Sequence, residues 1–445
     1  MGFLSDPVGW SQRRIRRHGP VFRSHLFGRS TLVVSGAEAV QFVLTNEERL
    51  FAAGDPEVRI PKVFGGTAYT IRHLLGNKSL IAQQGPAHRE SRQWLSKVLG
   101  TEALPGCAPL MEQVATRHIG RWAERGELEW YPAIQDFSFE IVARLFLGAD
   151  DKSLLPLRRA FNDWGRGLFS APIDLPWTRF GRAMRSRAKI VSYLRERIQT
   201  DNGEHSGAAI DALRTSWLQR GRAIEDSEFL EQMMLLMFAG HETVASALVS
   251  FFVFVSQHGD VRERLCREQQ QSVSTPLGFE SLREFQYLGQ AIKEVLRLNP
   301  PVGGGFRHVI ADFEYGKWSV SKGWIALYLI GPTHRDPSVY REPERFDPDR
   351  FGQARREEHA KPFAYIPFGF GPRACLGSQI AILQIRMLAA LVLRHCDWEI
   401  SPNQDLRFAH LPVPHPRSGV TVRFRLHAHG RRRIGKSVAG AMSAG

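Results

Sequence analysis

The sequence predicts a mainly α-helical protein with small β-sheets, folded as a single large domain around one long central helix. The 445 residues contain no Pro/Ser-rich linker and no shift of composition that would separate two domains. Helical periodicity fills much of residues 103–220 and returns in a long apolar stretch after residue 226. We place the domain at residues 1–426 and expect a basic, disordered tail at residues 427–445.

Composition narrows the choice of partners and of compartment. The formal net charge is +14, which makes nucleic acid a candidate partner. No nucleic-acid module is recognisable, so an acidic protein or an anionic surface is a better expectation, with plain solubility as the alternative for the tail. The four cysteines lack Cys-x-x-Cys spacing, which argues against a zinc site or a disulfide framework. We expect a cytoplasmic protein with no membrane span, because the N-terminus lacks a long apolar run.

The N-terminal part begins with a short basic helix over residues 10–18 and a β-hairpin over residues 21–34. Residues 51–81 are irregular, and loops of this kind commonly shape a pocket. A helix then starts near His88, which places His88 and Arg92 on one face because they are four residues apart. By itself this pair is more typical of a solvated basic surface than of a binding site.

The helical region that follows is interrupted at residues 170–177, where Pro172 and Pro176 break the periodicity. With Phe169 and Leu175 nearby, we interpret this break as a flexible roof over a pocket.

The central helix is expected to run from an Asp226 or Ser227 cap to Gly259. It is apolar on all sides, as either a membrane span or a core helix would be. Glu242 favours a core helix, since placing a carboxylate at the centre of a lone membrane helix costs roughly 3 kcal/mol or more. Thr243 can bond the carbonyl of Ala239 and open a notch beside Gly240, where a small ligand fits.

The C-terminal half contains several further patterns. Glu294 and Arg297 lie three residues apart on one helix, so they share a face and can pair. An extended strand then leads to Arg307, and residues 313–329 are typical of a hairpin that turns at Lys322-Gly323. A rigid proline turn at residues 412–416 precedes a closing strand at residues 419–426.

The stretch from Phe368 to Gly377 carries the chemistry. Its glycines allow positive φ and close backbone approach, so the loop can lie against a flat ligand and present the sulfur of Cys375. The helix that follows points its first N–H groups at that sulfur, which favours a thiolate. Arg373 suits an anionic edge of the same ligand. A dinucleotide fingerprint through Gly369, Gly371 and Ala374 is the alternative, but this loop lies near the C-terminus and is followed only by a long helix, with Cys396 and Asp397 beyond it.

This stretch resembles the haem-thiolate signature Phe-x-x-Gly-x-Arg-x-Cys-x-Gly of the cytochrome P-450 monooxygenases. The matching residues are Phe368, Gly371, Arg373, Cys375 and Gly377. The resemblance implies the family's fold and a haem b cofactor with Cys375 as the metal ligand. It also implies haem contacts from His88, Arg92, Arg307, Arg373, Phe368 and Gly377.

The resemblance implies two further roles away from the cysteine. The segment from Ala239 to Thr243 looks like the family's oxygen-activating segment, with Ala239, Gly240, Glu242 and Thr243 as the catalytic set. Residues 343–346 look like the segment that completes a buried structural network, which would join Glu294, Arg297 and Arg345.

Residues 238–243, 300–307 and 322–324 together look like the retinoic-acid-hydroxylating branch and its soluble cyanobacterial relatives. The sequence departs from the branch in lacking a proline-rich N-terminal segment. On this resemblance the substrate is a retinoid-type or isoprenoid-type carboxylic acid. The expected pocket residues are Phe238, Val302, Gly304, Phe306, Pro412 and Val413, and the loop candidates for holding a carboxylate are Arg59, Lys62 and Arg72.

The expected reaction is insertion of one oxygen atom from dioxygen into a C–H bond of an apolar substrate. A fatty-acid or sterol hydroxylase, a haem-thiolate peroxygenase or isomerase that does not use dioxygen, and a haem sensor are the alternatives. Because no reductase domain is visible and the chain is basic, we expect a monomer that receives electrons from an acidic ferredoxin or flavodoxin and its reductase.

Overall fold

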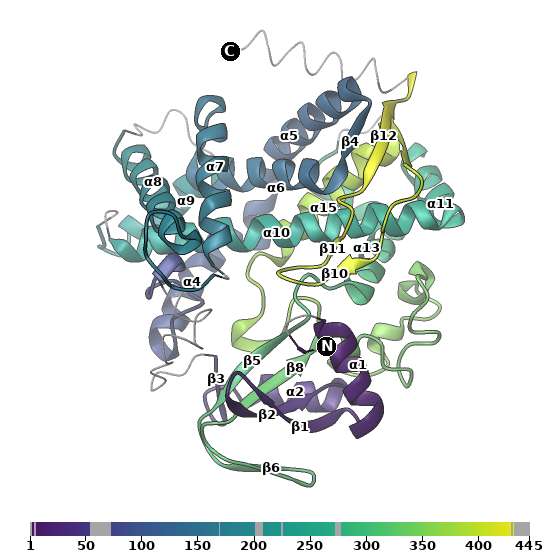
Figure 1. Ribbon diagram of the computed structural model, residues 1–445. Coiled ribbons are helices and arrows are strands. Elements are labelled where there is room, and N and C mark those ends of the chain that lie inside the picture. The colour runs from purple at the N-terminus through teal and green to yellow at the C-terminus, as the bar shows by residue number, and fades with distance from the viewer. Residues whose placement is uncertain are drawn as a thin grey trace.

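A computed structural model shows a helical body above a smaller part that is rich in β-strands (Figure 1). It describes residues 2–3, 6–53, 73–168, 170–200, 208–223, 226–271, 277–428 and 430. Phe169, Arg59, Lys62, Arg72 and nearly all of the predicted tail lie outside these residues. The predicted fold class, mainly helical with small sheets, is confirmed.

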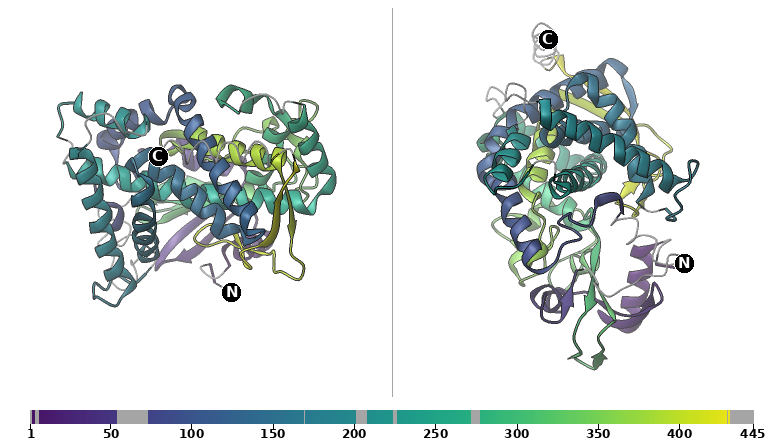
Figure 2. Two further views of the ribbon diagram at one scale, coloured as in Figure 1. Left: turned by 90° about the horizontal axis from the view of Figure 1, so that it is seen from above. Right: turned by 90° about the vertical axis from the view of Figure 1, so that its left-hand side faces the viewer.

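The helical body is built around α10 (Ser227–Gln257), which crosses the middle of the molecule in Figure 1. The Asp226 side chain caps its first turn by accepting a hydrogen bond from the Glu228 N–H at 2.9 Å. It packs against α6 (Trp130–Leu147), α13 (Gln286–Leu298) and α15 (Ser378–His395). Figure 2, right, shows it end-on with helices around it. Although α10 is long and apolar enough to cross a membrane, 67% of its most apolar window is buried inside the protein.

The other helices complete this body and flank the β-rich part. They are α1 (Pro7–His18), α2 (Ala37–Thr45), α4 (Gly85–Leu99), α5 (Leu104–Arg125), α7 (Asp151–Gly167), α8 (Arg179–Thr200), α9 (Ala208–Leu218), α11 (Gly259–Gln270), α12 (Phe279–Glu284) and α14 (Ile330–Thr333). The expected interruption near residues 170–177 lies between α7 and α8.

The β-rich part holds a five-stranded sheet in the order β1-β2-β8-β5-β3. Its strands are β1 (Val21–Leu26), β2 (Arg29–Val34), β8 (Ile325–Leu329), β5 (Gly304–Val309) and β3 (Phe51–Ala52). The predicted β1-β2 hairpin is confirmed, with Val21 opposite Val34. In a three-stranded sheet, β12 (Thr421–Leu426) lies between β4 (Glu127–Glu129) and β9 (Cys396–Ile400). Two further sheets pair β10 (Phe408–Ala409) with β11 (His415–Pro416) and β6 (Phe313–Tyr315) with β7 (Trp318–Val320).

The hairpin predicted over residues 313–329 is wrong in its turn. β6 and β7 pair through a turn at Gly316, whose φ of 56° is left-handed. The second turn, at Gly323, instead leads into β8. All five residues of β8 are buried, as is typical of a strand inside a sheet. This strand pairs with β2 and β5 in the large sheet and is not part of the short hairpin.

A buried ion network supports the end of α13. Glu294 accepts hydrogen bonds from Arg297 Nε at 2.6 Å and from Arg350 Nε at 2.9 Å, and all three side chains are fully buried. The assignment of Arg345 to this network is wrong. Its side chain is 65% exposed and lies 3.4 Å from Glu342, and only its carbonyl oxygen accepts bonds from the two buried arginines.

The 3₁₀ turn η2 (Pro348–Phe351) explains this difference, because it carries Arg350 inward five residues after the position expected from the resemblance. Loop spacing in the sequence does not reveal which of two nearby arginines the chain turns toward the core. The network therefore joins α13 to the loop after β8 through Arg350.

We expect Arg350→Ala to lower the free energy of unfolding by about 3–5 kcal/mol, because it removes one partner of a buried carboxylate. Arg345→Ala is the matched control and should cost less than about 1 kcal/mol, since it breaks only an exposed pair. The midpoint of urea unfolding measures both effects. Equal midpoints for the two variants would show that Arg350 is not the structural partner.

Candidate active site

The loop that precedes α15 is shaped by its backbone. Gly369 and Gly371 have φ values of 69° and 72°, which only glycine adopts without strain. The short turn η4 (Gly371–Arg373) follows, and the Cys375 N–H donates to the carbonyl of Phe368 at 2.8 Å. Gly377 then serves as the N-cap of α15. This geometry fixes Cys375 just before the N-terminal end of α15, as the sequence predicts.

The surroundings of Cys375 act on its thiol in opposite directions. The residue is exposed by surface area, yet burial is the largest influence on its thiol and raises the pKa. A hydrogen bond from the Gly377 N–H and the nearby Arg92 guanidinium both act to lower this pKa. The thiolate therefore needs a further cation, and a metal ion bound to the sulfur would supply it.

The other three cysteines have different surroundings. Cys107 and Cys396 are buried and Cys266 is half-buried, whereas Cys375 is exposed. Burial raises the pKa of Cys107 to about 11 and also raises the pKa of Cys266 and Cys396. Among the four cysteines, only Cys375 combines accessibility with nearby donors and a cation.

Thr243 lies on α10 as predicted. Its Oγ1 donates to the carbonyl of Ala239 at 2.7 Å, and Ala239 is exposed although Met237 and His241 on either side are buried. The exposure of Ala239 in the middle of a core helix indicates open space beside it. The predicted bond between Thr243 and Ala239 is confirmed.

Gly240 faces α6. A Cβ atom at this position would lie 2.9 Å from Val142 Cγ1 on α6, so the glycine permits close packing of two helices. The notch expected beside Gly240 stays a prediction. Ser138 on α6 adds hydrogen bonds to the carbonyls of Gly240 at 3.3 Å and His241 at 2.9 Å. Gly240 thus belongs to the contact between α10 and α6.

Glu242 is held by two side chains of α6 that sequence reasoning did not identify. Tyr131 Oη donates to its carboxylate at 3.0 Å, and Gln135 Nε2 donates to both oxygens at 2.9 and 3.0 Å. Burial, followed by the Glu242 charge, raises the pKa of Tyr131, which keeps its hydroxyl a donor. Neighbouring His241 is fully buried, and burial lowers its pKa well below the usual range, so it adds no charge to Glu242. Tyr131 and Gln135 precede Glu242 by 111 and 107 residues, and no sequence pattern links them to it.

Four basic side chains expected to bind a cofactor converge near the cysteine loop. Arg92 Nη1 donates to the carbonyl of Ala374 at 2.7 Å. His88 is buried, and burial together with the charges of Arg373, Arg92 and Arg89 lowers its pKa to about 4, so its imidazole is neutral at pH 7. Arg307 and Arg373 both bond to Glu47, a residue that the sequence analysis did not single out.

The expected pocket residues lie on several elements. Val302 and Phe306 have exposed fractions of 50% and 37%, and the Phe306 ring packs edge-on against Phe27 at 5.6 Å. Phe238 packs against Trp164 with ring centroids 6.0 Å apart.

The remaining pocket candidates differ in their exposure. Val413 is buried, and the carbonyl of Pro414 accepts a hydrogen bond from Ser246 of α10 at 2.5 Å, which holds the proline turn against this helix. Pro412, next to it, is exposed. Gly304 allows β5 to approach β8 closely, since a Cβ atom at Gly304 would lie 2.3 Å from the carbonyl oxygen of Tyr328.

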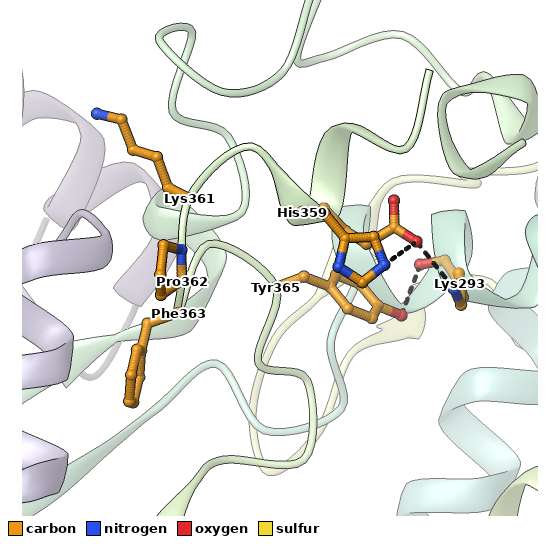
Figure 3. Close-up of a pocket in the computed structure, with 7 residues that line it drawn as sticks. Lys293, His359, Lys361, Pro362, Phe363 and Tyr365 are labelled. Atoms are coloured by element: carbon orange, nitrogen blue, oxygen red, sulfur yellow. Dashed lines mark hydrogen bonds and ion pairs between the residues drawn. The ribbon is translucent and has the colours of Figure 1, made fainter. Parts of the chain in front are cut away.

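A separate surface depression of about 420 Å³ does not contain Cys375 (Figure 3). Several of its polar groups already have partners: Lys293 pairs with Glu358 at 2.9 Å, and Tyr365 Oη donates to the Lys293 carbonyl at 3.1 Å. Its residues are Lys293, Glu358, His359, Lys361, Pro362, Phe363 and Tyr365. We therefore assign the chemistry to the cysteine loop and α10.

Comparison with known proteins places this geometry in context. The cytochrome P450 family model matches residues 11–417. Cytochrome P450 120 of Synechocystis sp. is 36% identical over 432 residues, which cover 96% of this chain and 94% of that protein. Cytochrome P450 26B1 of Xenopus tropicalis is 33% identical over 430 residues, which cover 93% of this chain and 81% of that protein.

Two solved structures are similar over nearly the whole chain. The retinoic-acid-bound cyanobacterial CYP120A1 has a TM-score of 0.83 and 34% identity, and the match covers 95% of this chain and 96% of that one. The cytochrome P450DA heme domain has a TM-score of 0.84 over 96% of this chain and 95% of that one, and at 19% identity this likeness concerns the fold alone.

Proposed function

The chain belongs to the cytochrome P450 family and is a monooxygenase, and we propose that it hydroxylates a retinoid-type or isoprenoid-type carboxylic acid at a haem b held by Cys375. The observation that carries this proposal is the exposed Cys375, fixed at the start of α15 with Arg92 beside it. Arg373 of the same loop has Arg307, Arg92 and neutral His88 as its neighbours. The retinoic-acid-bound relative, matched over almost its full length, supports the choice of substrate class.

The residues present fit a haem. Cys375 is an exposed residue, and the arginines near its loop offer donors for two carboxylates, which are the features that an iron porphyrin with two propionates requires. Cys375 would hold the iron, with the basic side chains at the propionates and Phe368 and Gly377 in the supporting loop. When bound, the haem supplies the redox chemistry that activates dioxygen and oxidises a C–H bond.

The protein's own groups deliver protons and exclude water. The hydroxyl of Thr243 keeps its proton in the bond to the Ala239 carbonyl and still offers lone pairs to a neighbouring proton donor. Glu242 is kept near the helix surface by Tyr131 and Gln135, where its carboxylate can exchange protons with water because it is 30% exposed. We assign Thr243 Oγ1 and the Glu242 carboxylate to proton transfer on this basis.

The substrate pocket is expected to be selective for apolar shape more than for chemical detail. The accessible side chains of Val302 and Phe306 and the small Ala239 offer hydrocarbon contacts, each worth roughly 25 cal/mol per Å² of apolar area buried. Contacts of this kind distinguish two substrates that differ by one methylene group by only about 1–3 kcal/mol. A carboxylate on the substrate must therefore set its orientation.

The first prediction concerns the metal ligand. Cys375→Ser should abolish the strongly red-shifted Soret band of the reduced protein under carbon monoxide, because that band requires thiolate ligation. Cys266→Ser changes a cysteine that is not exposed and should leave the spectrum unchanged. Retention of the band in Cys375→Ser would move the ligand elsewhere.

The second prediction concerns Thr243. Thr243→Ala should lower hydroxylated product severalfold and raise peroxide while reductant consumption continues, because it removes the hydroxyl that takes part in proton transfer without opening the core. Thr243→Ser keeps the hydroxyl and should stay close to the native ratio of product to peroxide. The ratio is measured from consumed reductant, product and peroxide in one assay. An unchanged ratio in Thr243→Ala would exclude this hydroxyl from proton transfer.

The third prediction tests the substrate class. Retinoic acid should shift the Soret band of the ferric protein to the blue and yield a hydroxylated product, while its methyl ester should bind more weakly because it has lost the carboxylate. A fatty acid and a sterol serve as comparison ligands in the same titration. If either of these gives both the shift and product while retinoic acid gives neither, the substrate proposal is wrong and only the monooxygenase assignment stands.

A further inference from the structure

Glu47 is a buried carboxylate at the junction of three segments. It lies in the turn after α2, and its side chain is only 5% exposed. One oxygen, Oε1, accepts a hydrogen bond from Arg373 Nε at 3.2 Å, and the other, Oε2, accepts one from Arg307 Nε at 3.2 Å. A single side chain therefore connects the cysteine loop to strand β5.

The turn that carries Glu47 is held by its own backbone. The Leu50 N–H donates to the Asn46 carbonyl at 2.9 Å, and the Glu48 N–H donates to the Phe51 carbonyl at 2.8 Å. Glu47 itself forms an isolated bridge with Phe51, the first residue of β3. Because this turn is closed, the carboxylate is presented from a fixed position.

Both arginines keep donors for another acid. A guanidinium carries five N–H groups. Among the described residues, Arg373 uses three of them, on Glu47 and on the carbonyls of Leu80 and Gln83. Arg307 uses two, on Glu47 and on its neighbour's carbonyl, Phe306. Each side chain can therefore bind a carboxylate while its Nε remains bonded to Glu47.

The charges at this end of the site also require Glu47. Burial lowers the pKa of Arg373, and the charges of Arg307 and Arg92 lower it further, while Glu47 acts in the opposite direction. His88 is neutral here, since its pKa is about 4. Among the described residues, Arg307 and Arg373 share the carboxylate of Glu47, and Arg92 adds a third positive charge beside Arg373. The two propionates of a haem would complete the balance of charge.

We propose that Glu47 is a positioning residue of the haem site, which orients Arg307 and Arg373 through their Nε atoms and leaves their terminal N–H groups for the two propionates. The proposal rests on the proposed function in one respect, that the cofactor is a haem held at Cys375. Glu47 need not touch the cofactor, because it acts through the two arginines.

The test measures haem release from the holoprotein into excess apomyoglobin. Glu47→Gln should release haem at least about tenfold faster, equivalent to about 1.4 kcal/mol of lost retention. Glu48→Gln is the matched control: it removes the same charge from the adjacent residue, whose side chain is 54% exposed and pairs with Arg89 at the surface. The control should release haem at the native rate.

A double-mutant cycle separates positioning from a general structural effect. Glu47→Gln and Arg307→Gln should each accelerate release, and their combination should be little worse than Arg307→Gln alone. Multiplying effects would show that Glu47 does not act through Arg307. Unchanged release from Glu47→Gln would show that Glu47 has no role in haem retention, and slower release would show that it competes with the propionates. An equal effect of Glu48→Gln would reduce the role to net charge. Each of these results overturns the proposal.

Glu47→Asp keeps the test decisive if Glu47→Gln does not fold. The shorter carboxylate retains the charge but does not reach both Nε atoms, so release should be faster than native, and native release would contradict the proposal. The carbon monoxide spectrum of the native protein checks the haem-thiolate assignment independently. Failure of that assignment is therefore distinguishable from failure of the role of Glu47.

Discussion

A sulfur anion inside a protein is stable only when positive charge lies close to it, and the arrangement around Cys375 follows from that requirement. Burial by itself raises the pKa of the Cys375 thiol, and one backbone N–H with one guanidinium reduces this effect without reversing it. The haem iron that the cytochrome P450 family uses would supply the missing charge, and the haem would bring carboxylates of its own. The arginines and the loop glycines are arranged for both parts of that cofactor.

Buried carboxylates connect the elements that the site needs. Glu294 ties α13 to the loop after β8 through Arg297 and Arg350, and Glu47 ties the cysteine loop to β5 through Arg373 and Arg307. Removal of one partner from such a cluster leaves an unpaired buried charge and costs about 3–5 kcal/mol. These clusters therefore hold the connected elements in one relative position, although each cluster adds little net stability compared with apolar packing.

The central helix α10 has two faces with different tasks. Toward α6 it presents Gly240, the carbonyls that Ser138 binds and the carboxylate of Glu242. On the other side it presents Ala239 and the hydroxyl of Thr243 to open space. Close packing on the first face keeps the helix rigid, so the groups on the second face stay at fixed positions. A proton-transfer site benefits from this, since donors must lie within hydrogen-bond reach of their acceptors.

Short stretches of sequence were enough to predict the local features of this protein. These are the start of α10, the β1-β2 hairpin, the glycine loop around Cys375 and the bonds between residues three or four apart, such as Thr243 with Ala239 and Arg297 with Glu294. These features depend on backbone conformation and helical spacing, which short stretches of sequence encode. Only the tertiary structure decided that Arg350 and not Arg345 joins Glu294, that Gly240 faces Val142, and that Glu47, Tyr131 and Gln135 hold the functional side chains. Each of these contacts joins residues far apart in the chain or depends on which way a loop turns. Their partners are therefore selected by the packing of whole elements, because a buried charge is stable only where packing brings its counter-charge.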